Sequence, residues 1–243
     1  MPEWYRERPP TADLTSALAC VWRANVGDGA HTLIPDGCVD LLWIDDGTVW
    51  LCGPETSAWS FSLPPGTTAV GARFKPGVAP RIVGLDAAEV SSARITLEAL
   101  WGDRATRELA ERVAEAEGPA SRVAVLQSAV RHRRAASPPV DPVASVVADR
   151  VAMPGPLSVR ALADDVGLSE RQLRRRCLSA FGYGPTVLAR ILRLQRFLAA
   201  ARAAGHSTSL AELALMTGYA DQPHLSREVR AIADTTPSAL VAS

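Results

Sequence analysis

The sequence has few of the residues that most often carry enzyme chemistry. Its four cysteines and four histidines are scattered, without the CxxC or Cys/His spacing that zinc sites use. A cupin-type metal enzyme would need two or three histidines in the strand-rich first third, where His31 stands alone. We therefore expect no metal, no cofactor and no enzyme activity.

Long apolar runs are also missing. No run approaches the ~18 residues that a membrane-spanning helix needs, and the stretch "MPEWYRERPP" is too polar for a secretory leader. We therefore expect a cytoplasmic protein with reduced thiols and no membrane partner.

Charge of one sign is not in excess overall, but it is concentrated in one stretch. The 26 basic and 26 acidic residues cancel, and Lys75 is the only lysine. Residues 169–202 nevertheless contain eight arginines and a single acid, Glu170. This local excess of positive charge favours a phosphate-rich partner.

The first 102 residues contain all six tryptophans and alternate short apolar runs with Pro-Gly and Asp-Gly turns. This pattern predicts an antiparallel β-sandwich or a β-barrel of the cupin-like kind in residues 1–102. Residues 103–135 predict two helices, from Asp103 to about Glu117 and from there to about Arg134. They either pack on the barrel or join two subunits in a homodimer. The overall fold class is therefore α+β with two domains.

Residues 136–243 are expected to be all-helical and contain an internal repeat. The segments "LADDVGLSERQLRRRC" and "LALMTGYADQPHLSREV" each contain a small residue, a glycine, a helix-capping residue and two apolar residues four apart. In chain order these are Ala163, Gly167, Ser169, Leu173 and Cys177 in the first segment, and Ala214, Gly218, Asp221, Leu225 and Val229 in the second. A small residue lets two helices cross closely, glycine allows a positive φ, and the cap begins the next helix. The repeat predicts two helix-turn-helix units.

The arginines of the first segment fall on two sides of the predicted helix. At 100° per residue, Arg171, Arg174 and Arg175 share one face, away from Leu173 and Cys177. Recognition helices present their first turns to base edges, and arginine pairs bidentately with guanine. We therefore interpret this face as DNA-reading, with double-stranded DNA as the partner.

A long helix is predicted between the two units, from Pro185 to a stop at Gly205. About twenty residues span roughly 30 Å, close to the ~34 Å between successive major grooves on one side of B-DNA. Its arginine side includes Arg190 and Arg193, which we expect at the DNA backbone. His224 is expected on the phosphate side as well.

These motifs carry a resemblance. Residues 140–241 resemble the paired helix-turn-helix domain of the AraC/XylS family of bacterial transcription regulators, most specifically in "GYADQPHLSRE". The resemblance implies seven helices, with recognition helices near 169–180 and 221–232. It implies base reading by Arg171, Arg174, Arg175, Gln222, Ser226 and Arg227. Cys177 and Val229 depart from the phenylalanine usual in the family, and Asp234 stands where members often have glycine.

The N-terminal half resembles, less specifically, the β-barrel sensors attached to such domains. The resemblance implies that residues 1–102 are an effector-sensing domain for a small molecule and that an activator would have RNA polymerase as a partner. In the strand 38–44, Asp40 needs a partner if it is buried, and Arg73 is a candidate. One hypothesis is that Cys38, Asp40, Trp43 and Arg73 line an effector site. The alternative is that Asp40 binds turn backbone and the tryptophans are core.

A second function remains open at this level. Cys38 or Cys52 could be the nucleophile of a thiol sensor or repair enzyme for electrophiles. The Pro-Cys-His-Arg motif expected of a DNA-repair alkyltransferase is absent. The sequence therefore favours a DNA-binding transcription regulator with a small-molecule sensor.

Overall fold

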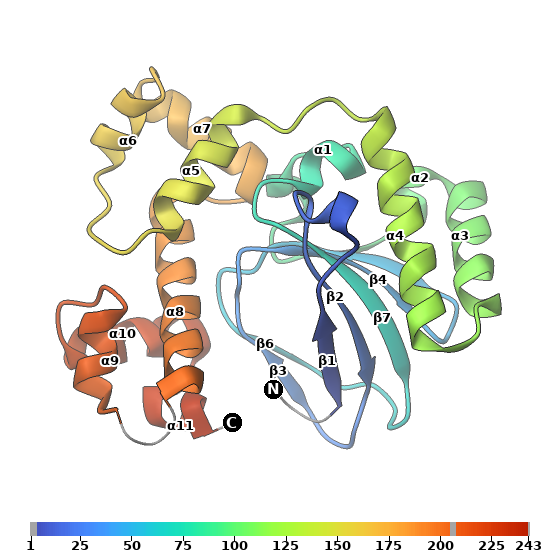
Figure 1. Ribbon diagram of the computed structural model, residues 1–243, viewed down its shortest axis with the longest axis horizontal. Coiled ribbons are helices and arrows are strands. Elements are labelled where there is room, and N and C mark those ends of the chain that lie inside the picture. The colour runs from blue at the N-terminus through green and yellow to red at the C-terminus, as the bar shows by residue number, and fades with distance from the viewer. Residues whose placement is uncertain (1–3, 205–207, 243) are drawn as a thin grey trace.

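A computed structural model of the chain describes residues 4–204 and 208–242. It has an N-terminal domain built on an antiparallel sheet and a helical C-terminal domain, side by side (Figure 1). The predicted fold class is confirmed. None of the helices in these two ranges is long and apolar enough to cross a membrane.

The N-terminal domain contains two antiparallel sheets. The larger has the strand order β1-β2-β7-β4-β5-β8, and the smaller pairs β3 with β6. The strands are β1 (Tyr5–Arg8), β2 (Leu18–Asn25), β3 (His31–Leu33), β4 (Val39–Ile44), β5 (Val49–Cys52), β6 (Trp59–Phe61), β7 (Thr68–Phe74) and β8 (Arg94–Thr96). Over the described residues β1 and β8 remain edge strands, so the expected barrel is an open pair of sheets.

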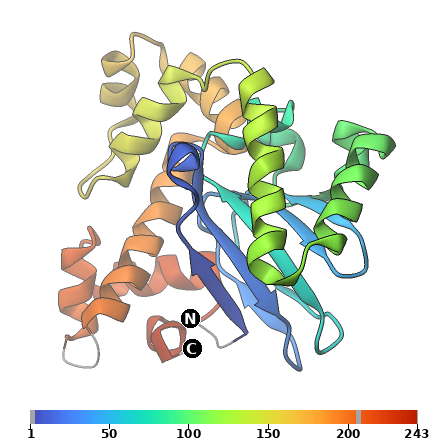
Figure 2. The same ribbon diagram turned by 45° about the vertical axis from the view of Figure 1, so that its right-hand side comes forward.

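Helices cover one face of the large sheet (Figures 1 and 2). They are η1 (Ala12–Leu14), α1 (Ala79–Val83), η2 (Ala87–Val90), α2 (Glu98–Trp101), α3 (Asp103–Glu115) and α4 (Gly118–Ala136). Leu109 and Val113 of α3 and Leu126 and Val130 of α4 are buried in the same core as the sheet. Each such side chain contributes about 1.5–3 kcal/mol of apolar burial, so this helical pair is held against the sheet of its own chain.

The C-terminal domain has seven helices in the described residues, the number that the family resemblance implies. They are α5 (Pro142–Ala152), α6 (Val159–Asp165), α7 (Glu170–Phe181), α8 (Pro185–Ala204), α9 (Leu210–Met216), α10 (Gln222–Ala233) and α11 (Pro237–Ala242). Leu188 and Ile191 of α8 belong to the core of α5–α7, whereas Leu194 and Phe197 belong to the core of α9–α11. One helix therefore joins two small hydrophobic cores. Its predicted stop, Gly205, lies outside the described residues.

The two domains are in direct contact. Hydrogen bonds that cross between them include Ser179 Oγ to Asp86 Oδ1 at 2.5 Å, Gln195 Nε2 to the Pro35 carbonyl at 2.7 Å, and the Ala58 amide to the Ile232 carbonyl at 2.6 Å. These bonds arise from α7, α8 and α10, so the N-terminal domain touches both helix-turn-helix units and the helix that joins them.

Candidate DNA-binding surface and sensor site

The first recognition helix, α7, begins where the sequence predicts. Ser169 is its N-cap, and its Oγ accepts a hydrogen bond from the Gln172 amide at 3.3 Å while Gln172 Oε1 accepts one from the Ser169 amide at 2.9 Å. Gly167 has φ = +67°, a conformation that costs little only for glycine. The turn and cap together fix the direction in which α7 leaves α6.

The arginines of α7 divide as their helical positions predict. Arg171, Arg174 and Arg175 are exposed, and no carboxylate in the described parts of the chain lies within ion-pair distance of them. Arg176 instead pairs with Asp141, the N-cap of α5, at 2.8 Å. Although burial raises the pKa of Asp141, its bonds to Arg176 and the Val143 amide lower it overall. Three guanidinium groups are thus left free on one face.

The second recognition helix, α10, has the same construction. Asp221 accepts a hydrogen bond from the His224 amide at 2.6 Å, and Gly218 has φ = +89°. Gln222 and Arg227 are exposed. Ser226, which lies between these two residues in the sequence, is half-buried. All three residues have access to solvent on the early turns of the helix, so their assignment to base reading stays a prediction.

A buried acid contacts the three basic side chains that we expected to bind the DNA backbone. Glu228 of α10 is 6% exposed and contacts Arg193 at 2.7 Å, Arg190 at 3.2 Å and, more distantly, His224 at 3.9 Å. Burial alone would lower the pKa of Arg193, but Glu228 raises it overall. Because Arg190 retains 40% side-chain exposure, it stays the better placed of the two arginines for a phosphate.

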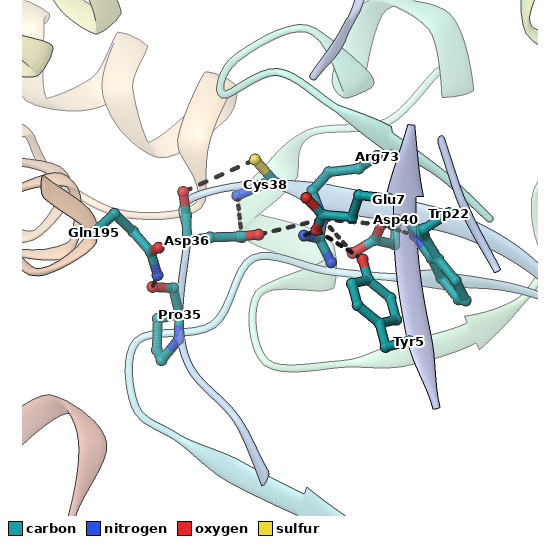
Figure 3. A network of polar contacts seen from close by, with 9 residues as sticks. All are labelled: Tyr5, Glu7, Trp22, Pro35, Asp36, Cys38, Asp40, Arg73 and Gln195. Atoms are coloured by element: carbon teal, nitrogen blue, oxygen red, sulfur yellow. Dashed lines mark hydrogen bonds and ion pairs between the residues drawn. The ribbon is translucent and has the colours of Figure 1, made fainter. Parts of the chain in front are cut away.

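The N-terminal domain contains a polar network (Figure 3). It lies on the face of the large sheet opposite to Val39, Leu41 and Trp43, which pack in the core with the helices. Arg73 Nε lies 3.2 Å from both Asp40 and Asp36, and Arg73 Nη1 lies 3.0 Å from Glu7. Asp40 also accepts a hydrogen bond from Trp22 Nε1 at 2.7 Å. Tyr5 completes the network through a 2.9 Å bond to Glu7. We call these six residues the sensor network: Tyr5, Glu7, Trp22, Asp36, Asp40 and Arg73.

The sensor network carries more acid than base. Burial, and then the charge of Asp36, raise the pKa of Asp40, while Arg73 opposes them. Burial would lower the pKa of Arg73, but Asp40 and Asp36 raise it well above its ordinary value. One guanidinium is therefore shared by three carboxyl groups, and a change in any of them alters the balance of the others.

The structure brings together three of the four residues predicted for an effector site. Asp40 and Arg73 are in contact, and the Cys38 amide donates to Asp36 Oδ1 at 2.9 Å. Trp43 lies elsewhere: it is 2% exposed, on the face of β4 that packs against the helices, with Arg122 over its ring at 4.9 Å. Trp43 is a core residue of the described structure.

The loop between β3 and β4 connects the sensor network to α8. Asp36 belongs to the network, and the neighbouring Pro35 carbonyl accepts the bond from Gln195 of α8 (Figure 3). Gly37, with φ = +81°, packs against Leu188 and the Tyr183 hydroxyl, which lie 3.3 and 3.5 Å from the position of a Cβ. A shift of this loop would therefore change its contacts with α8, the helix that both DNA-binding units share.

The cysteines have the properties of structural thiols. Burial raises the pKa of Cys52 to about 12 and that of Cys38 well above its ordinary value. Cys20 and Cys177 are also raised to about 12 by burial. Since the thiolate is the reactive form, the alternative of a thiol-based sensor or repair enzyme is not favoured. Residues 4–204 and 208–242 also contain no cluster of three potential metal ligands.

Comparisons with known proteins agree with this architecture. Residues 162–243 match the family model of a helix-turn-helix domain, and residues 6–96 match that of a domain of unknown function, DUF6597. ToxT from Vibrio cholerae is similar in structure, at 10% identity and a TM-score of 0.50, over 99% of this chain and 98% of that one. ToxT from Vibrio cholerae O395 bound to (E)-4-(8-methylnaphthalen-1-yl)but-3-enoic acid also has 10% identity and a TM-score of 0.50, over 99% of both chains. No curated protein matches the chain.

At this identity the likeness to ToxT concerns the fold alone, whereas the helix-turn-helix match covers α7, α8, α9 and α10 in sequence. The two capped turns, the exposed arginines of α7 and the shared helix α8 are the features that the family resemblance implies. Residues 162–243 therefore contain a helix-turn-helix domain of the AraC type, and residues 6–96 a domain of a type whose function is unknown.

Proposed function

We propose that the chain regulates transcription by placing α7 and α10 in two successive major grooves, under the control of a small molecule bound by the N-terminal domain. The observation that carries this proposal is the attachment of both units to α8. This helix has 20 residues, and such a length spans roughly 30 Å, near the ~34 Å repeat of B-DNA.

The residue assignments follow from exposure and position. Base reading is assigned to Arg171, Arg174, Arg175, Gln222, Ser226 and Arg227. Backbone contact is assigned to Arg190, Arg193 and His224, whose cluster with Glu228 holds α10 against α8. Phosphates would compete with Glu228 for Arg190 and Arg193, so DNA contact and packing between these helices are coupled.

The proposed division of labour is a sensor in residues 1–102, a helical pair in 103–135 and a DNA-binding domain in 136–243. We assign effector contact to Cys38, Asp40 and Arg73. The structure of ToxT bound to a small organic acid supports a small-molecule ligand for a protein of this two-domain architecture. An effector that displaces Asp36 from Arg73 would release the loop 34–38, because this ion pair joins the loop to the network. Such an effector shifts the populations of two domain arrangements only if it prefers one of them.

Other partners belong to the same proposal. A homodimer would use the surface of α3 and α4 that faces away from the sheet, and an activator would also contact RNA polymerase. A cytoplasmic location fits a DNA-binding regulator. A role without catalysis is supported by the half-buried thiols of Cys38 and Cys52, whose raised pKa values disfavour the reactive thiolate.

The test is selection of bound sequences from random duplexes, followed by affinity measurement with single variants. Arg174→Ala should weaken binding to the selected site about 5- to 150-fold, because a bidentate contact to guanine contributes about 1–3 kcal/mol, and should relax the preference at one base pair. Arg112→Ala, an exposed arginine of α3, is the control and should change neither. Unchanged affinity and unchanged preference for Arg174→Ala would refute base reading by α7.

A further inference from the structure

A second site lies on the other side of the strands that carry the sensor network. A cleft of about 320 Å³ opens between the β1–β2 edge of the sheet and the N-terminal turns of α4. Its volume is near the lower end of the ~300–1,000 Å³ that small-molecule sites occupy. Arg6 and Arg8 of β1 and Arg23 of β2 line one wall, and Ala120 and Val123 of α4 line the other.

The arginine wall is an unneutralised cluster. Arg6 stands directly opposite Arg23 in the β1–β2 ladder, and Arg8 lies two residues further along the same face. Like charges opposite one another destabilise a sheet. Over residues 4–204 and 208–242, no carboxylate lies within ion-pair distance of these three guanidinium groups. This side of the cleft is therefore suited to an anion.

The helical wall adds to this preference. The N-terminus of α4 lies at the cleft, and the positive end of the helix dipole there favours an anion. Its N-cap residue is Glu117, whose side chain makes no capping hydrogen bond. Gln127, 6% exposed, also lines the cleft; its Oε1 accepts the Thr11 amide at 2.7 Å. Its Nε2 donates to no residue in the described ranges. Val21 and Val123 supply apolar surface beside these donors.

We propose that this cleft binds a small organic anion with an apolar body. The carboxylate or sulfonate group would meet Arg6 and Arg23, whose guanidinium groups can form paired hydrogen bonds to it, and the apolar body would lie on Val21 and Val123. The site is separate from the sensor network, because Glu7 and Trp22 of the same strands point to the opposite face. No assignment of DNA contacts enters this proposal.

The experiment is isothermal titration calorimetry of the full chain, without DNA, with 2-naphthoate as the probe. We expect saturable binding at one site, at least tenfold weaker binding of neutral 2-naphthamide, and at least tenfold weaker binding of inorganic phosphate. Arg23→Gln should weaken 2-naphthoate binding at least tenfold. Arg112→Gln, which removes an exposed arginine outside the cleft, should leave it unchanged.

A second variant tests whether the ligand occupies the space of the cleft, without a change in its charge. Ala120 is exposed at the mouth of the cleft, and Ala120→Trp would fill the space while leaving the charge and the thermal midpoint unchanged. It should weaken 2-naphthoate binding at least tenfold. The proposal is overturned if no saturable binding occurs, if Arg23→Gln or Ala120→Trp binds as tightly as wild type, or if either the amide or phosphate binds as tightly as 2-naphthoate.

Discussion

The two helix-turn-helix units share a plan but are held differently. Residues 52 positions apart correspond: Leu173 with Leu225 in the cores, and Gly182 with Asp234 at the ends of the recognition helices. The end of α7 packs on the N-terminal domain, where a Cβ on Gly182 would lie 2.9 Å from Pro54. The second unit meets that domain through a backbone hydrogen bond of Ile232. The first unit is therefore the more tightly docked.

The same correspondence exposes a difference in charge. Arg176 in the first unit and Glu228 in the second each precede a buried core residue and each form an ion pair with a neighbouring helix. Arg176 is 48% exposed and its partner is Asp141, whereas Glu228 is 6% exposed and holds two arginines of α8. In the first unit the exposed arginines of α7 therefore stay accessible to solvent or DNA. In the second unit the arginines of α8 stabilise the packing of α10 on α8 through Glu228.

The largest expected effect tests the docking of the first unit. Gly182 has φ = +80°, and a Cβ there would meet Pro54 at 2.9 Å and the Ala87 carbonyl at 3.1 Å. Left-handed backbone costs a residue with a Cβ about 1–2 kcal/mol, and overpacking adds about 1–3 kcal/mol. Gly182→Ala should therefore lower the free energy of unfolding by about 3 kcal/mol, measured by urea denaturation.

The matched control is the glycine of the first turn. Gly167 also has a positive φ of +67°, but no atom lies within 4 Å of its Cβ position. Gly167→Ala should therefore lower the free energy of unfolding by only about 1 kcal/mol, the backbone cost alone. Equal losses in the two variants would show that the end of α7 is not packed on Pro54 and Ala87.

The next effect separates the two ion pairs. Glu228→Gln leaves Arg190 and Arg193 facing an uncharged amide at a 6% exposed position, and we expect a loss of about 2 kcal/mol, reduced from the ~3–5 kcal/mol of fully buried pairs because the arginines are partly exposed. Arg176→Gln should cost about 0.5 kcal/mol, as exposed pairs do. Hydrogen exchange should accelerate in α9 and α10 for the first variant only. Acceleration of α6 and α7 instead would contradict the assignment of Glu228 to the second unit.

Local signals in the sequence predicted the local structure of these units well. The caps Ser169 and Asp221 and the turns at Gly167 and Gly218 depend on neighbouring residues only, and all four are confirmed. Strand β4 alternates between its two faces, so that Val39, Leu41 and Trp43 are buried together and Asp40 lies on the opposite face. The prediction that Trp43 lines the effector site did not take this alternation into account.

Contacts between distant residues could not be predicted in the same way. Glu228 was missed because its partner Arg193 lies 35 residues away on another helix. The bond from Gln195 to Pro35 spans 160 residues and has no local signature. Strand β1, with the sequence "YRER", lacks the apolar alternation of a half-buried strand. Only its pairing with β2 brings its two arginines next to Arg23. Long-range pairing, rather than local pattern, creates both the sensor network and the arginine cleft.

The smallest expected effect sharpens the comparison at the ends of the two recognition helices. Asp234 has φ = +51°, the left-handed conformation that Gly182 adopts in the first unit. Asp234→Gly removes a backbone cost of about 1 kcal/mol, but glycine raises the entropy of the unfolded chain and returns about half of it. We expect a net gain of about 0.5 kcal/mol, or a rise in Tm of about 1–2 °C for a chain of this size. Asp234→Ala, which keeps a Cβ without the polar side chain that eases this conformation, should lower Tm instead. A lower Tm for Asp234→Gly would mean that the carboxylate stabilises the end of α10 by more than its backbone strain costs.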